Sequence, residues 1–402
     1  MMMERSSSVF GWAAAVGVAA AVLLDVAREV LTPVQPQLLH SPQAKDVARL
    51  AKEAGACEPW RQSFAFLGRW LSGHAQTIAY GVSWRSPPLD AAAMVRDRWQ
   101  TPDGGSIEVV WPAVELDPSA ARGVALILPG LGGSVEGSGH SVAACAAVGL
   151  LPCVFHQRGD GGAPLGSPRF NVFGDTRDLG DAVERVRAEH ALPVVLYATS
   201  AGTGILVRYL GERGADAPVA AAWCNNPGYD IGCAMTRCGW LYDSAYYLWR
   251  MKRHYLGGPN RALLEAFDAD ALRACLRART LHEFMVGAAP FAGAPTFGEY
   301  LLRSNPIGTA HNIRIPILIL NADDDPVCSV RNVDDHINLY KSHPTAVLCR
   351  VSRGGHCGNY ASGFWSAVPW GHHLGARFLA AAIAAGGPGP RGRTRVDDRG
   401  GL

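Results

Sequence analysis

Short apolar runs rich in β-branched residues recur along the chain from about residue 106 onward, and each is followed by a segment whose apolar positions have helical spacing. Several of these runs are apolar throughout instead of alternating, as strands covered on both faces must be. The runs predict β-strands at 106–111, 124–129, 152–156, 194–199, 219–224, 317–322 and 346–351.

The segments between these strands predict helices at 140–148, 179–188, 201–211, 330–340 and 375–385. Asp175 or Thr176 lies where it can cap the second helix, since both side chains accept hydrogen bonds from the first free amides of a helix. Strands and helices alternate in the order typical of a doubly wound, mostly parallel sheet. We therefore predict an α/β fold built on such a sheet.

The remaining segments predict the organisation around this sheet. We expect residues 31–105 to form an extension that packs on the core, and the core itself to comprise 106–227 and 314–385. Between the two core parts, residues 228–313 are helical and aromatic-rich, and an insertion of that length predicts a cap over the carboxyl edge of the sheet. The cap aromatics either line an acyl-chain funnel or form the core of the cap. The composition of residues 386–402, rich in Gly, Pro and Arg, predicts a disordered tail.

The N-terminus contains an apolar run without a charge from Val9 to Leu24, which is 16 residues. A helix that spans a bilayer usually has roughly 17–25 apolar residues, so the run is slightly short. Few charged residues precede the run and no clear cleavage motif follows it, so a cleaved signal peptide is a weaker interpretation than an anchor. A transit or peripheral segment is the other weaker interpretation. We expect residues 1–30 to be a signal anchor that makes the protein a single-pass membrane protein, with its orientation left open.

Composition limits the classes of function. The chain has 402 residues, of which 48% are apolar and 18% charged, so it can bury a sizeable core. Its net charge is only +2, without a clustered basic face, so we expect no nucleic-acid partner. The sequence contains no CxxC and no HExxH, and the adjacent His372 and His373 point different ways. We expect no metal, no cofactor, and reduced thiols that pack as small apolar side chains.

Ser200 is the first candidate for chemistry. It directly follows the strand 194–199 and precedes a helix, with Ala198 two residues before it and Gly202 two residues after it. A nucleophile elbow needs small residues at these two positions, because the turn from strand to helix is very tight. The usual pattern is GxSxG, and a serine that merely caps a helix is the alternative interpretation.

Two further residues complete a candidate catalytic triad. The sixth predicted strand ends before three aspartates, and we assign Asp324 as the carboxylate that orients a histidine; a solvated, helix-capping turn is the alternative, which fits Asp323 and Asp325. His356 lies in a glycine-bracketed loop after the next strand, where an ordinary surface histidine is the alternative. The order Ser200, Asp324, His356 is the one that a serine elbow of this kind requires, so the three matches together predict nucleophilic catalysis.

The tetrahedral intermediate of such a reaction needs two N–H donors for its oxyanion. One is the backbone amide of Ala201, directly after the nucleophile, and for the other we predict the amide of Leu131 in the glycine-rich loop 128–134. A phosphate-binding loop is the alternative for this segment, but neither GxGxxG nor GxxxxGK[ST] is present.

The motifs together resemble the ABHD-type, membrane-anchored subfamily of the α/β-hydrolases and its bacterial relatives. They follow one another in the family's order over roughly residues 60–385, and GHAQT and Arg-Gly-x-Gly-Gly are specific to that subfamily. The pieces are GHAQTI (73–78), QTPDGG (100–105), LPGLGGS (128–134), FHQRGDGG (155–162), PRF (168–170), GDTRDL (174–179), the serine elbow, LNADDDP (320–326) and RGGHCG (353–358). Departures include Ala198, Thr203, which we expect to crowd the elbow, and His156 before Arg158.

The resemblance implies an α/β-hydrolase fold and an anchored serine hydrolase that cleaves carboxylic esters through an acyl-enzyme on Ser200. It implies substrates that are acyl lipids, such as phospholipids or monoacylglycerols, or simpler esters, and a location in an endomembrane such as the endoplasmic reticulum. The family's catalytic positions map onto Ser200, Asp324 and His356. Transfer of the acyl group to an alcohol is one alternative, because it uses the same nucleophile and oxyanion hole. A catalytically silent binding protein on the same fold is the other.

Overall fold

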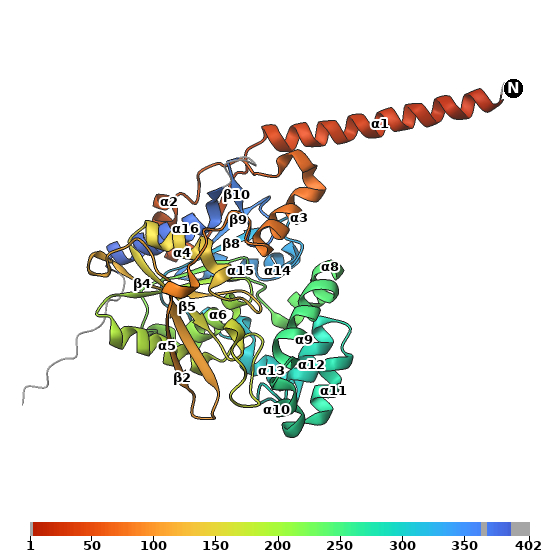
Figure 1. The fold of residues 1–402 in the computed structure, drawn as a ribbon. Helices are drawn as coiled ribbons and strands as arrows, with labels where there is room; N and C mark the ends of the chain where they lie inside the picture. Colours follow the sequence, from red (N-terminus) through yellow and green to blue (C-terminus); the bar gives the residue numbers. More distant parts are fainter. Residues whose placement is uncertain (1–2, 363–367, 387–402) are drawn as a thin grey trace, which may run out of the picture.

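A nine-stranded sheet forms the centre of the computed structural model, which describes residues 3–362 and 368–386 (Figure 1). The strand order is β1-β9-β8-β7-β6-β4-β5-β3-β2, and neighbours from β9 across to β5 are parallel, whereas β1, β3 and β2 join in antiparallel pairs. The strands are β1 (Gln37–Leu39), β2 (Val95–Gln100), β3 (Ser106–Trp111), β4 (Gly123–Leu128), β5 (Leu150–His156), β6 (Val194–Thr199), β7 (Ala222–Asn225), β8 (Ile317–Ala322) and β9 (Ala346–Val351). The predicted mostly parallel sheet is confirmed.

The strand bounds follow the apolar runs closely, and β3, β6, β8 and β9 have the predicted limits. Two strands of this sheet escape the prediction, as do β10 (Tyr360–Ala361) and β11 (Val368–Pro369), which pair with each other. β1 is very short, and β2 pairs with β3 at the edge of the sheet, where Arg96, Asp97 and Arg98 keep it from forming an apolar run. An antiparallel edge strand with one solvated side does not need such a run.

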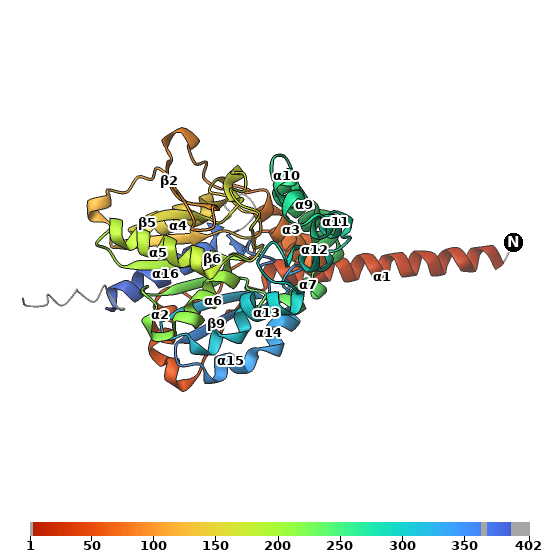
Figure 2. The same ribbon diagram turned by 90° about the horizontal axis from the view of Figure 1, so that it is seen from below.

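Helices cover both faces of the sheet, as Figures 1 and 2 show. Side chains of one strand alternate between the two layers: Val124 and Leu126 in β4 pack into one core cluster, and Ala125 and Ile127 into the other. On one face lie α2 (Lys45–Glu53), α4 (Gly139–Ala147) and α16 (Trp370–Ala384). On the other lie α5 (Thr176–Glu189), α6 (Gly202–Arg213), α14 (Val330–Asp335) and α15 (Ile337–Ser342).

Two helices differ from their predictions. The helix predicted over 330–340 is divided at His336 into α14 and α15. α16 begins at Trp370, five residues earlier than predicted, and contains Gly371 and Gly375, whose weak helix propensity hides its start. A Cβ on Gly375 would lie 2.5 Å from the Trp223 ring, so the glycine permits close packing on the sheet. Asp175, not Thr176, caps α5 through its side chain.

Helices fill the segment between β7 and β8, where the cap is predicted. They are α7 (Ile231–Arg237), α8 (Trp240–Tyr242), the π-helical turn η8 (Asp243–Tyr247), α9 (Leu248–Leu256), α10 (Asn260–Phe267), α11 (Ala269–Arg277), α12 (Leu281–Ala288) and α13 (Phe297–Ser304). Most of them share a hydrophobic cluster with the segment before α5, and in it Phe170 of that segment stacks on Tyr255 with ring centroids 4.3 Å apart. Part of the cap aromatics therefore form its core.

The N-terminal part of the chain contributes α1 (Met3–Leu31), which projects away from the body in Figures 1 and 2, and α3 (Gly68–Gly81) beside its base. The two helices are joined where the Asp25 carboxylate accepts the Arg69 amide at 2.9 Å. Within the described ranges, no helix combines the length and apolar composition that crossing a membrane requires. The signal anchor predicted for residues 1–30 stays a prediction, and all of the predicted tail except Gly386 lies outside the described residues.

Candidate active site

Ser200 lies in a tight turn between β6 and α6. Its φ is +50°, a left-handed conformation that costs free energy in any residue other than glycine and that marks functional turns. A Cβ on Gly202 would lie 2.4 Å from the carbonyl oxygens of Leu128 and Pro129, so only glycine fits there. Thr203, which was expected to crowd the elbow, is accommodated: it is buried and its hydroxyl donates a hydrogen bond to the Ser200 carbonyl oxygen at 2.5 Å.

The side chains of Ser200 and His356 come together at the carboxyl edge of the sheet, although 156 positions separate them along the chain. The Ser200 hydroxyl lies 2.7 Å from His356 Nε2. On the other side of the ring, Nδ1 donates to the Asp325 carboxylate at 2.8 Å. A hydroxyl, an imidazole and a carboxylate joined in this order are the geometry of a serine nucleophile with its base and the group that orients the base.

The assignment of Asp324 as the orienting carboxylate is wrong in its geometry, because Asp325 occupies that position. Asp324 accepts the Gly355 amide at 2.8 Å, and its other oxygen is buried without a hydrogen-bond partner in the described structure. Asp323 pairs with Arg350 at 2.6 Å. The three aspartates leave one turn in three directions, and nothing in their spacing tells which one faces the histidine.

Several hydrogen-bond donors surround the Asp325 carboxylate. One carboxylate oxygen accepts the amides of Val327 and Cys328, each at 2.8 Å, and the other accepts the Asn226 side-chain amide at 2.8 Å in addition to the imidazole. Burial alone would lower the pKa of His356, but the Asp325 charge outweighs burial and holds this pKa well above its usual value. The pair therefore favours the imidazolium that forms when the ring accepts a proton.

Within the described residues, the Asp324 carboxyl is buried without a compensating cation beside it. Burial raises the pKa of its carboxyl to about 7, and the neighbouring charge of Asp325 adds to the rise. Its unpartnered oxygen faces Gly73 in α3, where an added Cβ would lie 2.8 Å away. Close packing, not catalysis, explains where this side chain lies.

The two amides predicted for the oxyanion hole lie beside the nucleophile. Leu131 and Ala201 line the same pocket as Ser200. In the described structure, neither amide donates to the backbone outside the regular helices and strands. Gly130 lets the loop approach, because a Cβ there would lie 3.1 Å from that of Ser200. Both N–H groups can therefore serve a negatively charged oxygen formed at Ser200.

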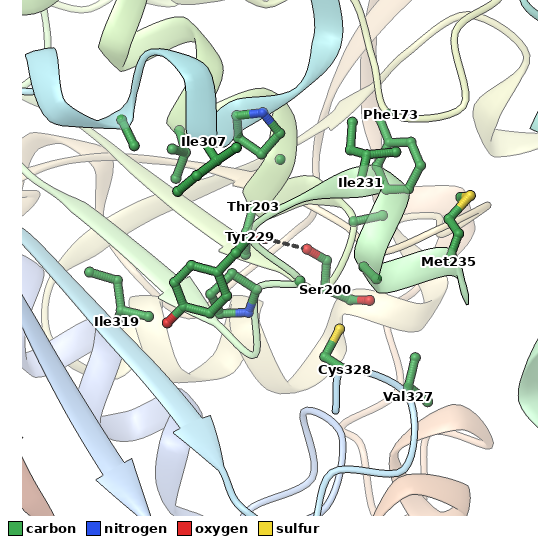
Figure 3. Close-up of a pocket in the computed structure, with 18 of the residues that line it drawn as sticks. Phe173, Ser200, Thr203, Tyr229, Ile231, Met235, Ile307, Ile319, Val327 and Cys328 are labelled. Carbon is green, nitrogen blue, oxygen red and sulfur yellow. Dashed lines mark hydrogen bonds between the residues drawn. The ribbon is translucent and has the colours of Figure 1, made fainter. Parts of the chain in front are cut away.

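Two pockets meet at Ser200. The first, here called the inner pocket, lies beneath the cap, encloses about 1040 Å³ with its open mouth included, and has an almost wholly apolar lining that includes Phe173, Ile231, Met235 and Ile319 (Figure 3). Such a lining suits an alkyl chain.

The second, here called the outer pocket, encloses about 1400 Å³ with its mouth included. It lies between α3 and the start of the cap, and Ser200 and His356 are among its lining residues. Tyr242 and Tyr247 of the cap line it, so some of the cap aromatics do face the site. A bound molecule can thus extend from Ser200 in two directions.

The chain is similar in sequence to several curated proteins. No family model matches the chain. Protein ABHD15 of Homo sapiens is 30% identical over 311 residues, which are 72% of this chain and 63% of that protein. Phospholipase ABHD3 of Mus musculus is 28% identical over 279 residues, 66% of each chain. The chain is therefore similar in sequence to these two ABHD proteins.

A third relative broadens the comparison. Medium-chain fatty acid ethyl ester synthase/esterase 2 of Saccharomyces cerevisiae is 30% identical over 207 residues, 45% of each chain. The chain spans less than two thirds of the length of the curated relatives described here. The resemblance drawn from the motifs is confirmed.

The GHAQT motif, one of the pieces on which the resemblance rests, supports the histidine loop from α3. The Thr77 hydroxyl accepts the backbone amide of His356 at 2.9 Å. The Gln76 side chain accepts the Tyr360 amide at 2.7 Å and donates to the Tyr360 carbonyl at 3.2 Å, as a paired strand would. A Cβ on Gly355 would lie 2.3 Å from the Gly73 carbonyl oxygen. The motif therefore fixes the backbone that carries the imidazole.

His156, one of the departures from the ABHD pattern, supports the oxyanion loop. Its Nε2 accepts the Val135 amide at 2.9 Å, and its Nδ1 donates to Glu108 at 2.8 Å. Burial alone would raise the pKa of Glu108, but hydrogen bonds from His156 and Arg98 lower it to about 2. The pair is buried and lies directly opposite across β3 and β5. The sequence alone does not reveal this pair, although a Glu within the apolar run 106–111 is a signal for it.

Three other ABHD motifs meet at Arg158. Its guanidinium binds Asp178 of GDTRDL through two hydrogen bonds of 2.6 and 2.9 Å and Asp103 of QTPDGG through a third of 2.5 Å. A bidentate arginine–carboxylate pair holds geometry as well as charge. The motifs thus join the β2–β3 turn and the N-terminus of α5 to the loop after β5.

One set of side chains has the composition of a metal site. Ligand atoms of Asp325, Cys328 and His356 lie within 4.8 Å of one another. The donors of Asp325 and His356 are already bound to each other, and the remaining imidazole nitrogen is bound to Ser200. This arrangement fits proton transfer better than metal coordination.

Proposed function

We propose that the chain is a serine hydrolase that cleaves carboxylic esters of acyl lipids through an acyl-enzyme on Ser200, with His356 as general base and Asp325 as the carboxylate that orients it. The observation that carries the proposal is the hydrogen-bonded series Ser200–His356–Asp325 at the junction of two pockets. Relatives named phospholipase and esterase support this class of reaction.

The reaction begins when the Ser200 hydroxyl attacks the ester carbonyl and His356 Nε2 takes its proton. The Asp325 carboxylate holds the ring with Nδ1 protonated and stabilises the imidazolium. The amides of Leu131 and Ala201 donate to the oxyanion of the tetrahedral intermediate. His356 then returns the proton to the leaving alcohol, and water repeats the sequence on the acyl-enzyme.

The two pockets divide the substrate. The apolar inner pocket accepts the acyl chain, because its lining offers almost no polar partner. The outer pocket, which has hydroxyl groups from Thr77, Ser83 and Ser134 in its lining, accepts the alcohol part and releases it. Phospholipids and monoacylglycerols both have this division into an alkyl chain and a polar alcohol.

The proposal is tested with a fluorophosphonate probe and a panel of esters. Wild-type protein is expected to be labelled covalently on serine and to hydrolyse esters, and Ser200→Ala to lose both. A folded wild-type protein that ignores the probe and cleaves no ester would instead be a catalytically silent binding protein. Comparing the lipids of cells that carry wild type or Ser200→Ala then names the substrate class, because the uncleaved ester accumulates.

Acyl transfer to an alcohol is the second candidate, favoured by the yeast relative named both synthase and esterase. It shares every step up to the acyl-enzyme and differs in what resolves that intermediate. Adding ethanol or a lysolipid to the assay separates the two functions: a transferase yields mainly the new ester, and a hydrolase yields mainly the free acid.

We further propose that residues 1–30 attach the protein to an endomembrane such as the endoplasmic reticulum. The motivation is the uncharged run from Val9 to Leu24 within α1. Full-length protein is expected to sediment with membranes and a chain lacking residues 1–30 to lose the greater part of that association. Unchanged sedimentation of the shortened chain would contradict this anchor.

A further inference from the structure

Exposed apolar side chains surround the mouth of the outer pocket. Leu71, Ile78 and Val82 follow one stripe of α3 and the residue after it, and their exposures are 58%, 52% and 69%. These positions share one helix face, because they are separated by seven and four residues. Ile78 and Val82 also line the pocket, so the stripe reaches its mouth. This face of α3 is unlike the opposite one, which packs on the histidine loop.

The cap contributes the other side of the mouth. Leu241 and Tyr246 line the pocket and are 51% and 38% exposed, and Trp240 beside them is 75% exposed. Together with Trp70, which is 78% exposed, these residues and the α3 stripe are called the rim here. The other large apolar side chains exposed within the described residues lie on α1, on neighbours of the rim (Phe66 and Trp249), or singly elsewhere, at Val95, Phe267, Val286, Leu302 and Val368.

Basic side chains lie beside the interfacial aromatics of the rim, and Asp25 of α1 lies close to one of them, Arg69. Residues 66–86 include Arg69 and Arg85 and no acidic residue. The Arg69 guanidinium lies over the Trp70 ring at 5.4 Å, and that of Arg253 lies over Trp249 at 5.6 Å. Tryptophan and tyrosine favour the boundary between lipid and water, and arginine keeps its charge at that boundary while its stem lies on apolar surface.

We infer that the rim docks on the surface of a phospholipid bilayer, so that the outer pocket opens directly onto membrane lipid. The basic groups complement lipid phosphates, and the apolar side chains enter the boundary with the acyl chains. Figure 1 shows α3 between the base of α1 and the cap helix α8, so the docking face adjoins α1. The inference rests on the proposed function, because it supplies that same site with its substrate.

The test uses the full chain with Leu71→Glu and Trp70→Glu, neither of which lines the outer or the inner pocket. Leu302→Glu in α13 is the matched control, since Leu302 is 77% exposed but lies away from the rim. Rates are measured on an ester embedded in phosphatidylcholine/phosphatidylglycerol vesicles and on a water-soluble short-chain ester. We expect the two α3 variants to lose tenfold or more on vesicles and to keep the soluble rate, and the control to keep both.

Equal vesicle rates in the α3 variants and the control would overturn the inference, as would a change of oligomeric state in the α3 variants with an unchanged vesicle rate. Trp240→Glu repeats the test across the mouth if an α3 variant fails to fold.

Docking is also measured without turnover, in Ser200→Ala protein with vesicles of brominated phospholipid, which quench nearby tryptophan. Trp70→Phe is expected to remove part of the quenching and Trp99→Phe in β2 none. Identical quenching in both variants would overturn docking, whereas absent labelling of Ser200 in the wild type overturns only the proposed function.

Discussion

The two adjacent aspartates offer a matched pair of variants, because only Asp325 binds the imidazole. In Asp325→Asn one side-chain atom still accepts the amides of Val327 and Cys328. The other becomes an NH₂ group that faces two donors, the Asn226 amide and His356 Nδ1–H. The ring must then turn or change its tautomer, and its positive charge loses its partner.

The magnitude follows from this loss. Replacing the orienting aspartate of a serine triad by asparagine lowers kcat by about 10⁴, which corresponds to about 5 kcal/mol of transition-state stabilisation. Asp324→Asn keeps the acceptor for the Gly355 amide and changes only an oxygen that has no partner in the described structure. We expect its kcat to stay within about threefold of wild type, less than 1 kcal/mol.

The assay is steady-state hydrolysis of a soluble chromogenic ester, with circular dichroism to confirm that both variants fold. Labelling by a fluorophosphonate probe gives a second measure of the nucleophile. If Asp324→Asn lost as much activity as Asp325→Asn, or if Asp325→Asn stayed near wild type, the assignment of the carboxylate drawn from the hydrogen bonds would be refuted.

Three further predictions concern charge and loop support. Since Asp325 raises the pKa of His356 and catalysis needs the neutral ring, kcat/KM should rise with pH through a value above 6.5, and a limb at or below 6.5 would contradict this. The pKa of the Asp324 carboxyl is raised from 3.8 to about 7, so this group favours the folded state fully only below pH 3.8. The free energy of unfolding should therefore fall by about 4 kcal/mol as the pH rises to 7. Denaturant unfolding of Asp324→Asn should lack this decline. His156→Ala frees the Val135 amide and should lower kcat about tenfold to a hundredfold with little change in KM, whereas an effect on KM alone would show that the loop does not depend on it.

The features that the sequence predicts well are those held by local pattern. Apolar runs locate the parallel strands, because strands covered on both faces need continuous apolar residues. Small residues on both sides identify Ser200, because the tight turn leaves no room for a side chain at Gly202. The glycine-bracketed loop locates His356.

The features that escape prediction depend on where side chains meet after folding. Three consecutive aspartates have the same chemistry, and only the path of the turn selects Asp325. His156 and Glu108 become neighbours through the register of β3 and β5, which neither segment specifies alone. The exposure of the apolar stripe on α3 cannot be predicted for the same reason. In the sequence this stripe is indistinguishable from the core-facing side of a helix, and only the folded structure shows that it is uncovered.

The two-sided role of α3 has a practical consequence for how this protein is produced. Thr77 and Gln76 hold the backbone of the loop that carries His356 from one side of that helix, so α3 belongs to the candidate active site although it precedes the α/β core. Trimming the chain to the α/β core to improve its solubility would remove these hydrogen bonds to the histidine loop, and neither detergent nor refolding would restore them. A shortened chain that keeps this support must start upstream of Gly68, although the exposed apolar side chains of α3 then stay in the purified protein.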